Sequence, residues 1–290
     1  MKKFEVGNKI PSFLPDGEWK LVWHDEFDEG KLDRTKWDFR RNMMGKHCKQ
    51  WVADEGIEFD DDNIIFKFIK KGDVYCSSQL QTGYNFMDGS AQEFDALSNE
   101  SKVSKDGTIQ YFSWPIGEIK EPKFQKKYGY FECRCKLKEK AGWWTAFWLQ
   151  SPIIGSTMNP QFSGVEVDIM EQFRLPDKIQ HANHWNGYGS QHMGSGATYV
   201  DIEETEDGYH TFGLDWTPEY YRYYVDGKLT LEIKADGEFP VSQTEQFILI
   251  STESMGYRSS TWNCWEDTEK AVGDKWIVDY VRVFERENDE

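Results

Sequence analysis

Long apolar runs are missing from this sequence. No stretch of its 290 residues stays apolar over the length needed to span a bilayer. The amino terminus, residues 1–6, also lacks the apolar segment of a secretory signal peptide. We therefore expect no membrane partner. The location is expected to be either cytoplasmic or that of a mature secreted form expressed without its signal.

Positive charge is also scarce. Lysine and arginine together number 34, against 51 aspartate and glutamate residues, which gives a formal net charge of −17. This balance argues against nucleic acid and against anionic membrane surfaces as partners. It also disfavours a densely sulfated polysaccharide as the substrate, although a local basic patch could outweigh the global sign.

Cysteine is sparse and its count is odd. The five cysteines are Cys48, Cys76, Cys133, Cys135 and Cys264. Two of them, separated by one residue, would share a strand face, which is a poor geometry for a disulfide between them. The sequence has no C-x-x-C pair or His/Cys cluster of the kind that binds zinc. We interpret the cysteines as small apolar core residues and expect no cofactor for catalysis.

Long helical periodicity is absent, and strand patterns take its place. Residues 130–137 alternate apolar and polar side chains, as residues 64–68 also do. The pair Asp226-Gly227 joins two further alternating runs and suits the type I′ turn of a β-hairpin. With no repeat or linker, these short strands predict an all-β sandwich. We expect one domain over residues 1–290, with a core of about 18–286, acting as a monomer.

Aromatic side chains are abundant, at 16% of the chain, including 13 tryptophans. Most are expected to fill a β core, and the remainder suits a sugar-binding cleft. Trp144 and Trp148 would share one strand face with Ala146 between them. If that face lines a cleft, the two rings are stacking platforms for glycosyl units; otherwise they fill the core.

Three carboxylates lie on one expected strand. Glu166, Asp168 and Glu171 are separated by Val167, Ile169 and Met170, which favour a buried strand. Acidic residues are costly to bury there without partners, so three in six positions need an explanation. Paired-carboxylate catalysis is the most economical one, and an ion-pair network or a calcium site is the alternative.

Strand geometry makes this hypothesis more specific. Glu166 and Asp168 share a face because side chains alternate, whereas Glu171 would point the other way in a regular strand. A β-bulge at Ile169-Met170 restores the parity and turns all three acids to one side. Glu166 and Glu171 would then be roughly 13 Å apart at Cα, at ~3.3 Å per step. Their carboxyl groups could approach to about 5–6 Å, near the spacing in retaining glycosidases.

The surrounding sequence resembles glycoside hydrolase family 16, whose bulged E-x-D-x-x-E signature matches residues 166–171. Four further landmarks resemble the family in the same order over roughly residues 20–285: Trp23 to Phe27 with Leu32-Asp33 and Trp37; Tyr128 to Glu132 leading to Trp144 to Leu149; Phe212 to Pro218 leading to Tyr224 to Gly227; and Val278 to Val283.

The resemblance implies a jelly roll of two curved antiparallel sheets with a substrate cleft on the concave face. It implies endo-acting, retaining hydrolysis of β-linked glucans or galactans. By motif position Glu166 would be the nucleophile and Glu171 the general acid/base. Asp168 would lie between them and hydrogen-bond the nucleophile.

Further residues are candidates for binding. His184 and Trp185 lie on the expected neighbouring strand and could contact substrate, and Trp114 could sit on a loop at the cleft rim; each could equally be structural. Some members of the family bind a structural calcium on the convex side. There Asp279 matches the position of a ligand, and Glu26 is a weaker candidate.

Three functions remain open at this point. The first is a β-1,3- or mixed-linkage β-1,3/1,4-glucanase. The second is a hydrolase of β-galactans of the agarose, carrageenan or porphyran type, with basic or polar groups replacing some aromatic platforms. The third is a non-catalytic carbohydrate-binding jelly roll, against which the acid pair argues. The segment before the motif, Phe162-Ser163-Gly164, departs from the laminarin-cleaving pattern, which leaves the substrate open.

Overall fold

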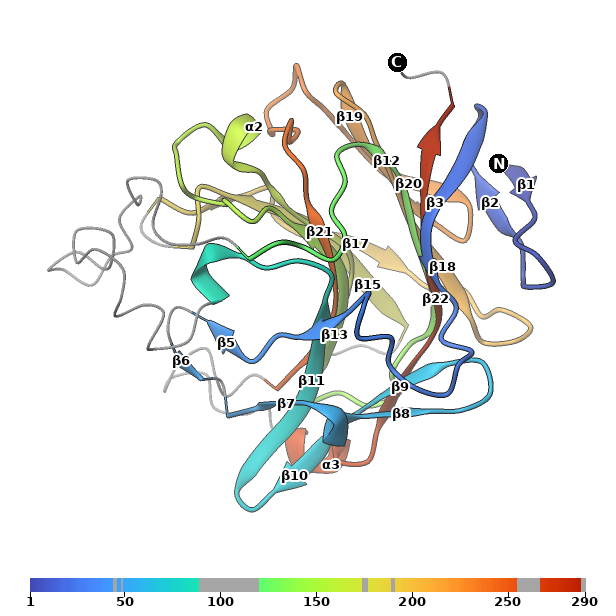
Figure 1. The fold of residues 1–290 in the computed structure, drawn as a ribbon, viewed down its shortest axis with the longest axis vertical. Helices are drawn as coiled ribbons and strands as arrows, with labels where there is room; N and C mark the ends of the chain where they lie inside the picture. Colours follow the sequence, from blue (N-terminus) through green and yellow to red (C-terminus); the bar gives the residue numbers. More distant parts are fainter. Residues whose placement is uncertain are drawn as a thin grey trace, which may run out of the picture.

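Two large sheets, antiparallel except for one short parallel pair, account for most of the protein (Figure 1). The computed structural model describes residues 1–43, 46–47, 49–88, 120–173, 177–188, 191–254 and 267–287. In these ranges the strands follow the alternating segments of the sequence, which confirms the expected all-β class. Within them, no helix is long and apolar enough to cross a membrane.

The first sheet has ten strands and contains the acidic motif. Seven of them form its main path, in the order β10 (Ile69–Lys71), β11 (Val74–Gln81), β21 (Phe247–Glu253), β13 (Trp144–Gln150), β14 (Glu166–Gln172), β15 (Lys178–Trp185) and β16 (Met193–Gly194). The other three pair at its sides: β17 (Thr198–Asp201) with β15, and β4 (Asp38–Phe39) and β7 (Trp51–Val52) with β11.

The second sheet has eight strands and packs against the first. Its path runs β20 (Lys228–Lys234), β19 (Tyr220–Val225), β18 (His210–Trp216), β12 (Gly129–Lys136), β22 (Lys275–Arg286), β9 (Ile64–Lys67) and β8 (Ile57–Phe59), and β3 (Trp19–Asp25) pairs with β22. The turn between β19 and β20 has positive φ at both Asp226 (48°) and Gly227 (73°). This backbone is that of the type I′ hairpin predicted from the Asp-Gly pair.

Short elements complete the described chain. They are the hairpin of β1 (Lys2–Phe4) and β2 (Ser12–Leu14), the pair β5 (Asn42–Met43) and β6 (Lys46–His47), the helices α2 (Pro160–Ser163) and α3 (Thr268–Ala271), and the 3-10 turns η1 (Asp54–Gly56) and η2 (Phe86–Asp88).

The hydrophobic core lies between the two sheets. Phe131, Cys133 and Cys135 of β12 point into it with no exposed surface, as their alternation predicts. The residues that alternate with core positions form two smaller apolar clusters. One contains Trp144, Ala146 and Trp148 on the outer face of the ten-stranded sheet. The other lies on the outer face of the eight-stranded sheet and includes residues of the β1–β2 hairpin. The molecule therefore has two distinct outer faces, and the acidic motif belongs to the first.

Candidate active site

The acidic motif occupies β14, and the register of its neighbours reveals an extra residue. Against β13, Phe147 pairs with Met170 and Trp148 with Asp168, so Ile169 has no counterpart there. Against β15, Asp168 pairs with Ala182 and Glu171 with Gln180, which leaves two residues of β14 opposite one of β15. This two-against-one pairing is a β-bulge, at the position predicted from the sequence.

The bulge determines which way each side chain points. Ile169 and Met170 are consecutive, yet both are fully buried in the core between the sheets. The strand therefore regains parity at the next residue, and Glu171 returns to the outer face opposite Ala146. Glu166, Asp168 and Glu171 consequently share that face, which a straight strand could not achieve.

Glu166 is partly exposed and receives hydrogen bonds from uncharged donors. The Tyr188 hydroxyl donates to Glu166 Oε2, and Gln150 Nε2 lies 3.4 Å from the same oxygen. Gln150 also donates to the Tyr188 hydroxyl, so the three side chains form a closed set. Burial, and next the adjacent Glu166 charge, raise the pKa of Tyr188, which keeps its phenol protonated and able to donate.

A tight turn brings Tyr188 to this position. Asn186 and Gly187 follow β15 with φ of 62° and 69°, which reverses the chain toward β14. Gly155 packs against this turn so closely that a Cβ on it would lie 2.6 Å from the Gly187 Cα atom. The close approach of two glycines thus allows a residue outside the sheet to reach Glu166.

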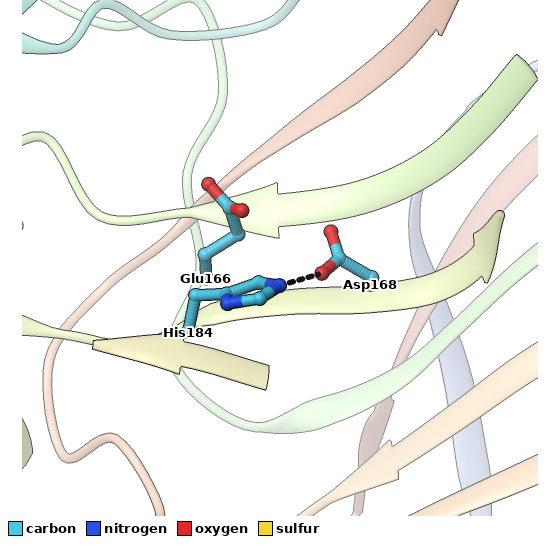
Figure 2. A group of neighbouring side chains, drawn as sticks. All are labelled: Glu166, Asp168 and His184. Atoms are coloured by element: carbon cyan, nitrogen blue, oxygen red, sulfur yellow. Dashed lines mark ion pairs between the residues drawn. The ribbon is translucent and has the colours of Figure 1, made fainter. Parts of the chain in front are cut away.

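Asp168 lies at the centre of the acidic row. Its Oδ2 atom is 3.6 Å from His184 Nε2, and only 4% of the residue is exposed. Figure 2 shows the His184 ring beside Glu166 and turned toward Asp168. One ligating atom from each of the three lies within 4.8 Å of the others. His184 Nδ1 in turn lies 3.0 Å from Nε2 of His192, which is exposed. The two imidazoles therefore connect Asp168 to the surface.

Glu171 is held from the neighbouring strand. Gln180 Nε2 donates to Glu171 Oε2 at 2.9 Å, and the two residues are directly opposite in the β14–β15 register. Only 9% of Glu171 is exposed. The amide fixes one carboxylate oxygen and carries no charge.

The two tryptophans predicted as platforms do share the acidic face. Trp148 is opposite Asp168, and its Nε1 donates to Ser251 Oγ at 2.9 Å, while the Arg40 guanidinium lies 5.4 Å from its ring. Trp144 packs against Phe173 with ring centroids 5.0 Å apart. Trp144 is only 2% exposed and Trp148 only 6%, so the two rings form the floor of this face.

Trp185 was expected beside the acids, and the structure corrects this. It follows His184 directly, so strand alternation sends its side chain to the opposite side of the sheet. There it is buried in the core and packs against Phe239, with the two ring centroids 6.0 Å apart. Trp114, the candidate for the rim, lies outside the described residues.

The two residues matched to a calcium site do not fit that role. Glu26 is engaged by Arg282 through both carboxylate oxygens, at 2.9 and 2.6 Å, and Asp279 is ion-paired with Arg134. Calcium needs six to eight oxygen ligands, and two arginines would repel it. The sequence match missed these arginines because they come from β12 and β22 and meet the acids only in the folded sheet.

A cavity of about 420 Å³ lies in line with the acidic row. Its lining residue Gln81 pairs with Leu249, Leu249 with Trp148, and Trp148 with Asp168, one strand after another. At ~4.8 Å per strand, the cavity edge on β11 is roughly 14 Å from β14. Charged side chains of both signs line it, among them Arg34, Arg41, Lys120, Asp54 and Glu121.

Three of the residues that contact the acids, Gln150, Gln180 and Tyr188, were not singled out from the sequence. Gln150 lies two residues after Trp148 on β13, so strand parity alone could have placed it on the same, acidic face. Gln180 could have been found from the β14–β15 pairing once the bulge was assumed. Tyr188 gave no such signal, because its position depends on a turn and on contacts with another loop.

Comparison with known proteins identifies the family of this chain. Residues 90–282, about two thirds of the chain, match the model for glycosyl hydrolases family 16. A glucan endo-1,3-beta-glucosidase A1 of Niallia circulans is 25% identical over 92% of this chain, which spans only 38% of that protein. A beta-glucanase of Rhodothermus marinus is 26% identical over 92% of this chain and 85% of its own length.

A solved structure gives the same architecture. SCLam, a non-specific endo-beta-1,3(4)-glucanase, matches with a TM-score of 0.63 and 22% identity, over 96% of this chain and 94% of its own. This likeness confirms the jelly-roll sandwich expected from the sequence. With its bulged acidic strand and a family match over most of its length, the chain belongs to glycosyl hydrolases family 16.

Proposed function

We propose that this chain is an endo-acting, retaining hydrolase of β-1,3- or mixed-linkage β-1,3/1,4-glucans. The observation on which the proposal depends is the bulge in β14, because it brings Glu166 and Glu171 to one face. The names of the glucanase relatives favour a glucan substrate. A variant of SCLam, which has this fold, presents 1,3-beta-D-cellobiosyl-glucose at its active site.

The reaction follows the double displacement of retaining glycosidases. In the first step a Glu166 carboxylate oxygen attacks the anomeric carbon, the glycosidic bond breaks, and Glu171 gives its proton to the leaving oxygen. In the second step Glu171 takes a proton from water, and that water attacks the glycosyl-enzyme and releases Glu166. The anomeric configuration is inverted twice and so is retained.

The neighbouring side chains support this assignment of roles. Tyr188 and Gln150 hold the proposed nucleophile, and Gln180 holds the proposed acid/base, all through uncharged groups. Asp168 lies between the two glutamates in sequence and on the same face of the sheet. The cavity in line with the acids could extend substrate binding along the sheet, as an endo-acting enzyme requires.

A β-galactan hydrolase is the second candidate, and one observation favours it. The cavity in line with the acids is lined largely by charged and polar groups, and Trp144 and Trp148 are buried rather than open. This is the pattern expected of a site for galactans with charged substituents. The chemistry at Glu166 and Glu171 would be unchanged.

A substrate panel tests these functions. The protein is incubated with laminarin, lichenan, agarose, carrageenan and galactan, and new reducing ends are measured, with Glu166→Gln as the inactive control. We expect cleavage of laminarin or lichenan into oligosaccharides, and NMR of the first products should detect the β-anomer. Cleavage of a galactan alone would establish the second candidate. Binding of glycans without turnover would establish a non-catalytic protein and refute the proposal.

A further inference from the structure

The bulge in β14 faces a single residue of β15. Asp168 pairs with Ala182 and Glu171 with Gln180, so Ile169 and Met170 together lie opposite His181. His181 is fully buried, and its ring lies 4.8 Å from that of Tyr223 in the other sheet. Its side chain therefore lies between the two sheets, next to the bulge of the strand that carries the acids.

His181 binds the backbone of the bulge itself. Its Nδ1 atom lies 2.6 Å from the Ile169 carbonyl oxygen. A β-bulge interrupts the regular ladder, and a buried carbonyl that loses its partner costs free energy. The histidine supplies a hydrogen bond at the very residue that β14 has in excess over β13.

The far side of the ring is anchored to the opposite sheet. His181 Nε2 lies 2.9 Å from Thr230 Oγ1 of β20. A carbonyl can only accept, so Nδ1 must carry the proton, and Nε2 of the neutral ring can only accept. The single hydroxyl hydrogen of Thr230 is shared between Nε2 and the Tyr223 carbonyl oxygen, which lies 3.1 Å from Thr230 Oγ1. Burial lowers the pKa of His181 to about 4, which keeps the ring neutral and this tautomer in place near neutral pH.

We propose that His181 is a positioning residue: by holding the Ile169 carbonyl against β20, it fixes the bulge and so sets where Glu171 stands relative to Glu166. The inference rests on the proposed function, since it concerns the geometry of the same two carboxylates. His181 touches no substrate in this role. Its effect is transmitted through two residues of backbone to Glu171, and a displacement of about 1 Å there would cost roughly 100-fold in rate.

Two variants separate the hydrogen bond from simple packing. His181→Leu fills much of the space but cannot donate, whereas His181→Asn places an amide N–H close to the position of Nδ1. We expect the leucine variant to lose roughly 10- to 100-fold in kcat on the best polysaccharide of the panel, with KM changed less than about threefold. The asparagine variant should recover most of the lost kcat.

A matched core variant controls for stability. Ile233→Val on β20 removes one methylene from the same core and costs about 1 kcal/mol, on a strand that pairs with β19 and not with β14 or β15. It should leave kcat unchanged. Thr230→Val, which removes only the hydroxyl on Nε2, should have a smaller effect on kcat than His181→Leu. Equal losses of kcat in the leucine and asparagine variants, with both folded, would overturn the proposal.

A structural readout keeps the test independent of activity. Crystal structures of wild type and His181→Leu are compared at the β14–β15 register. The variant should lose the register shift between Asp168 and Glu171 or displace Glu171 from the outer face. An unchanged bulge would contradict the inference whether or not the protein is a hydrolase. An inactive wild type with an altered bulge in the variant would refute the proposed function alone.

Discussion

The two outer faces of the sandwich both hold carboxylates with little exposure, but they give them different partners. On the face of the eight-stranded sheet the acids meet guanidinium groups: Glu26 with Arg282, Asp279 with Arg134, and Asp215 with Arg286. On the face of the ten-stranded sheet the three acids of β14 contact amide, phenol and imidazole groups: Gln150 and Tyr188 on Glu166, His184 on Asp168, and Gln180 on Glu171.

The difference matches the roles that we propose for the two faces. An arginine stays charged at all relevant pH values and favours the ionised form of its carboxylate, although burial still raises the pKa of Asp215 and of Asp279. Burial alone would raise the pKa of Glu26, but hydrogen bonds from His24 and Arg282 outweigh it and lower that pKa to about 2. A carboxylate locked in this way serves stability. The general acid/base that we propose at Glu171 must take up and release a proton in each cycle, and the Gln180 amide that holds it carries no charge.

Substitution of single acids should give the largest difference in kcat between the two faces. Glu166→Gln and Glu171→Gln should each lower kcat by at least about 10³-fold without unfolding the protein, because each removes a reacting group. Asp279→Asn on the other face should keep kcat near wild type. Steady-state kinetics on the best polysaccharide, with circular dichroism for folding, checks both.

Chemical rescue then distinguishes the roles of the two acids. Added azide should restore cleavage by Glu171→Ala of substrates with good leaving groups, since a small nucleophile replaces base-activated water. Glu166 variants should instead make oligosaccharides from an activated α-glycosyl fluoride. Comparable azide-derived β-glycosyl products from both variants would show that the roles have been misassigned.

Much of the acidic face could be predicted from the sequence, because parity is a local property. Three acids among buried residues required a bulge, and the bulge is found at Ile169 and Met170. Trp144 and Trp148 followed from the same alternation. The prediction that Trp185 contacts substrate fails on the same rule: a residue next to His184 on a strand must face the other way, and here that side is the core.

The partners of the acids could not be predicted, because they come from elsewhere in the chain. Tyr188 reaches Glu166 only through a turn with two positive φ angles, braced by Gly155. The arginines that engage Glu26 and Asp279 lie on strands far from them in sequence, or at the opposite end of the chain. Motif matching compares positions along the sequence and does not include charges that folding brings together, so it offered calcium ligands at two residues that the structure shows in ion pairs.

Loss of one arginine should test the structural role of the second face. Arg282 has no exposed surface and also donates to the Ile10 carbonyl and Ser12 Oγ near the β1–β2 hairpin. Arg282→Met leaves Glu26 buried without its charge partner, so we expect a loss of about 3–5 kcal/mol in the free energy of unfolding. Urea denaturation measures it, and kcat per folded molecule should not change.

The double variant Glu26→Gln, Arg282→Met provides the control. Removing both charges should recover a large part of the lost stability, since most of the cost in the single variant is the unpaired carboxylate. If the double variant is no more stable than Arg282→Met alone, the ion pair is not the cause, and packing of the arginine stem would explain the loss.

Two tyrosines allow a matched comparison of hydroxyl groups. Tyr188 donates to Glu166 on the acidic face, and Tyr280 donates to Glu132 Oε1 at 3.2 Å on the other. Tyr188→Phe should lower kcat/KM about tenfold, because it removes a hydrogen bond to a charged reacting group. Tyr280→Phe should leave kcat/KM within about twofold. Equal effects of the two substitutions on kcat/KM would show that the Tyr188 hydroxyl has no special role at Glu166.

Glu132 should affect only the stability of the protein, and its effect should appear as a dependence of the free energy of unfolding on pH. This residue of β12 is 1% exposed, and burial raises the pKa of its carboxyl to about 7, against the opposing influence of Ser12, Arg282 and Tyr280. The folded protein then keeps the proton up to about pH 7, whereas the unfolded chain releases it near pH 4.5. Stability from this group is therefore present below pH 4.5 and is lost as the pH rises to about 7.

Glu132→Gln removes this loss, because glutamine has the same shape and no charge to bury. Relative to wild type, the variant should gain about 1–3 kcal/mol in unfolding free energy between pH 5 and pH 8. Parallel urea titrations across that range measure the difference, and groups common to both proteins, such as Glu26 and His181, cancel from it. A difference that does not change with pH would mean that Glu132 is ionised throughout, held by Arg282 as the other acids of that face are held by their arginines.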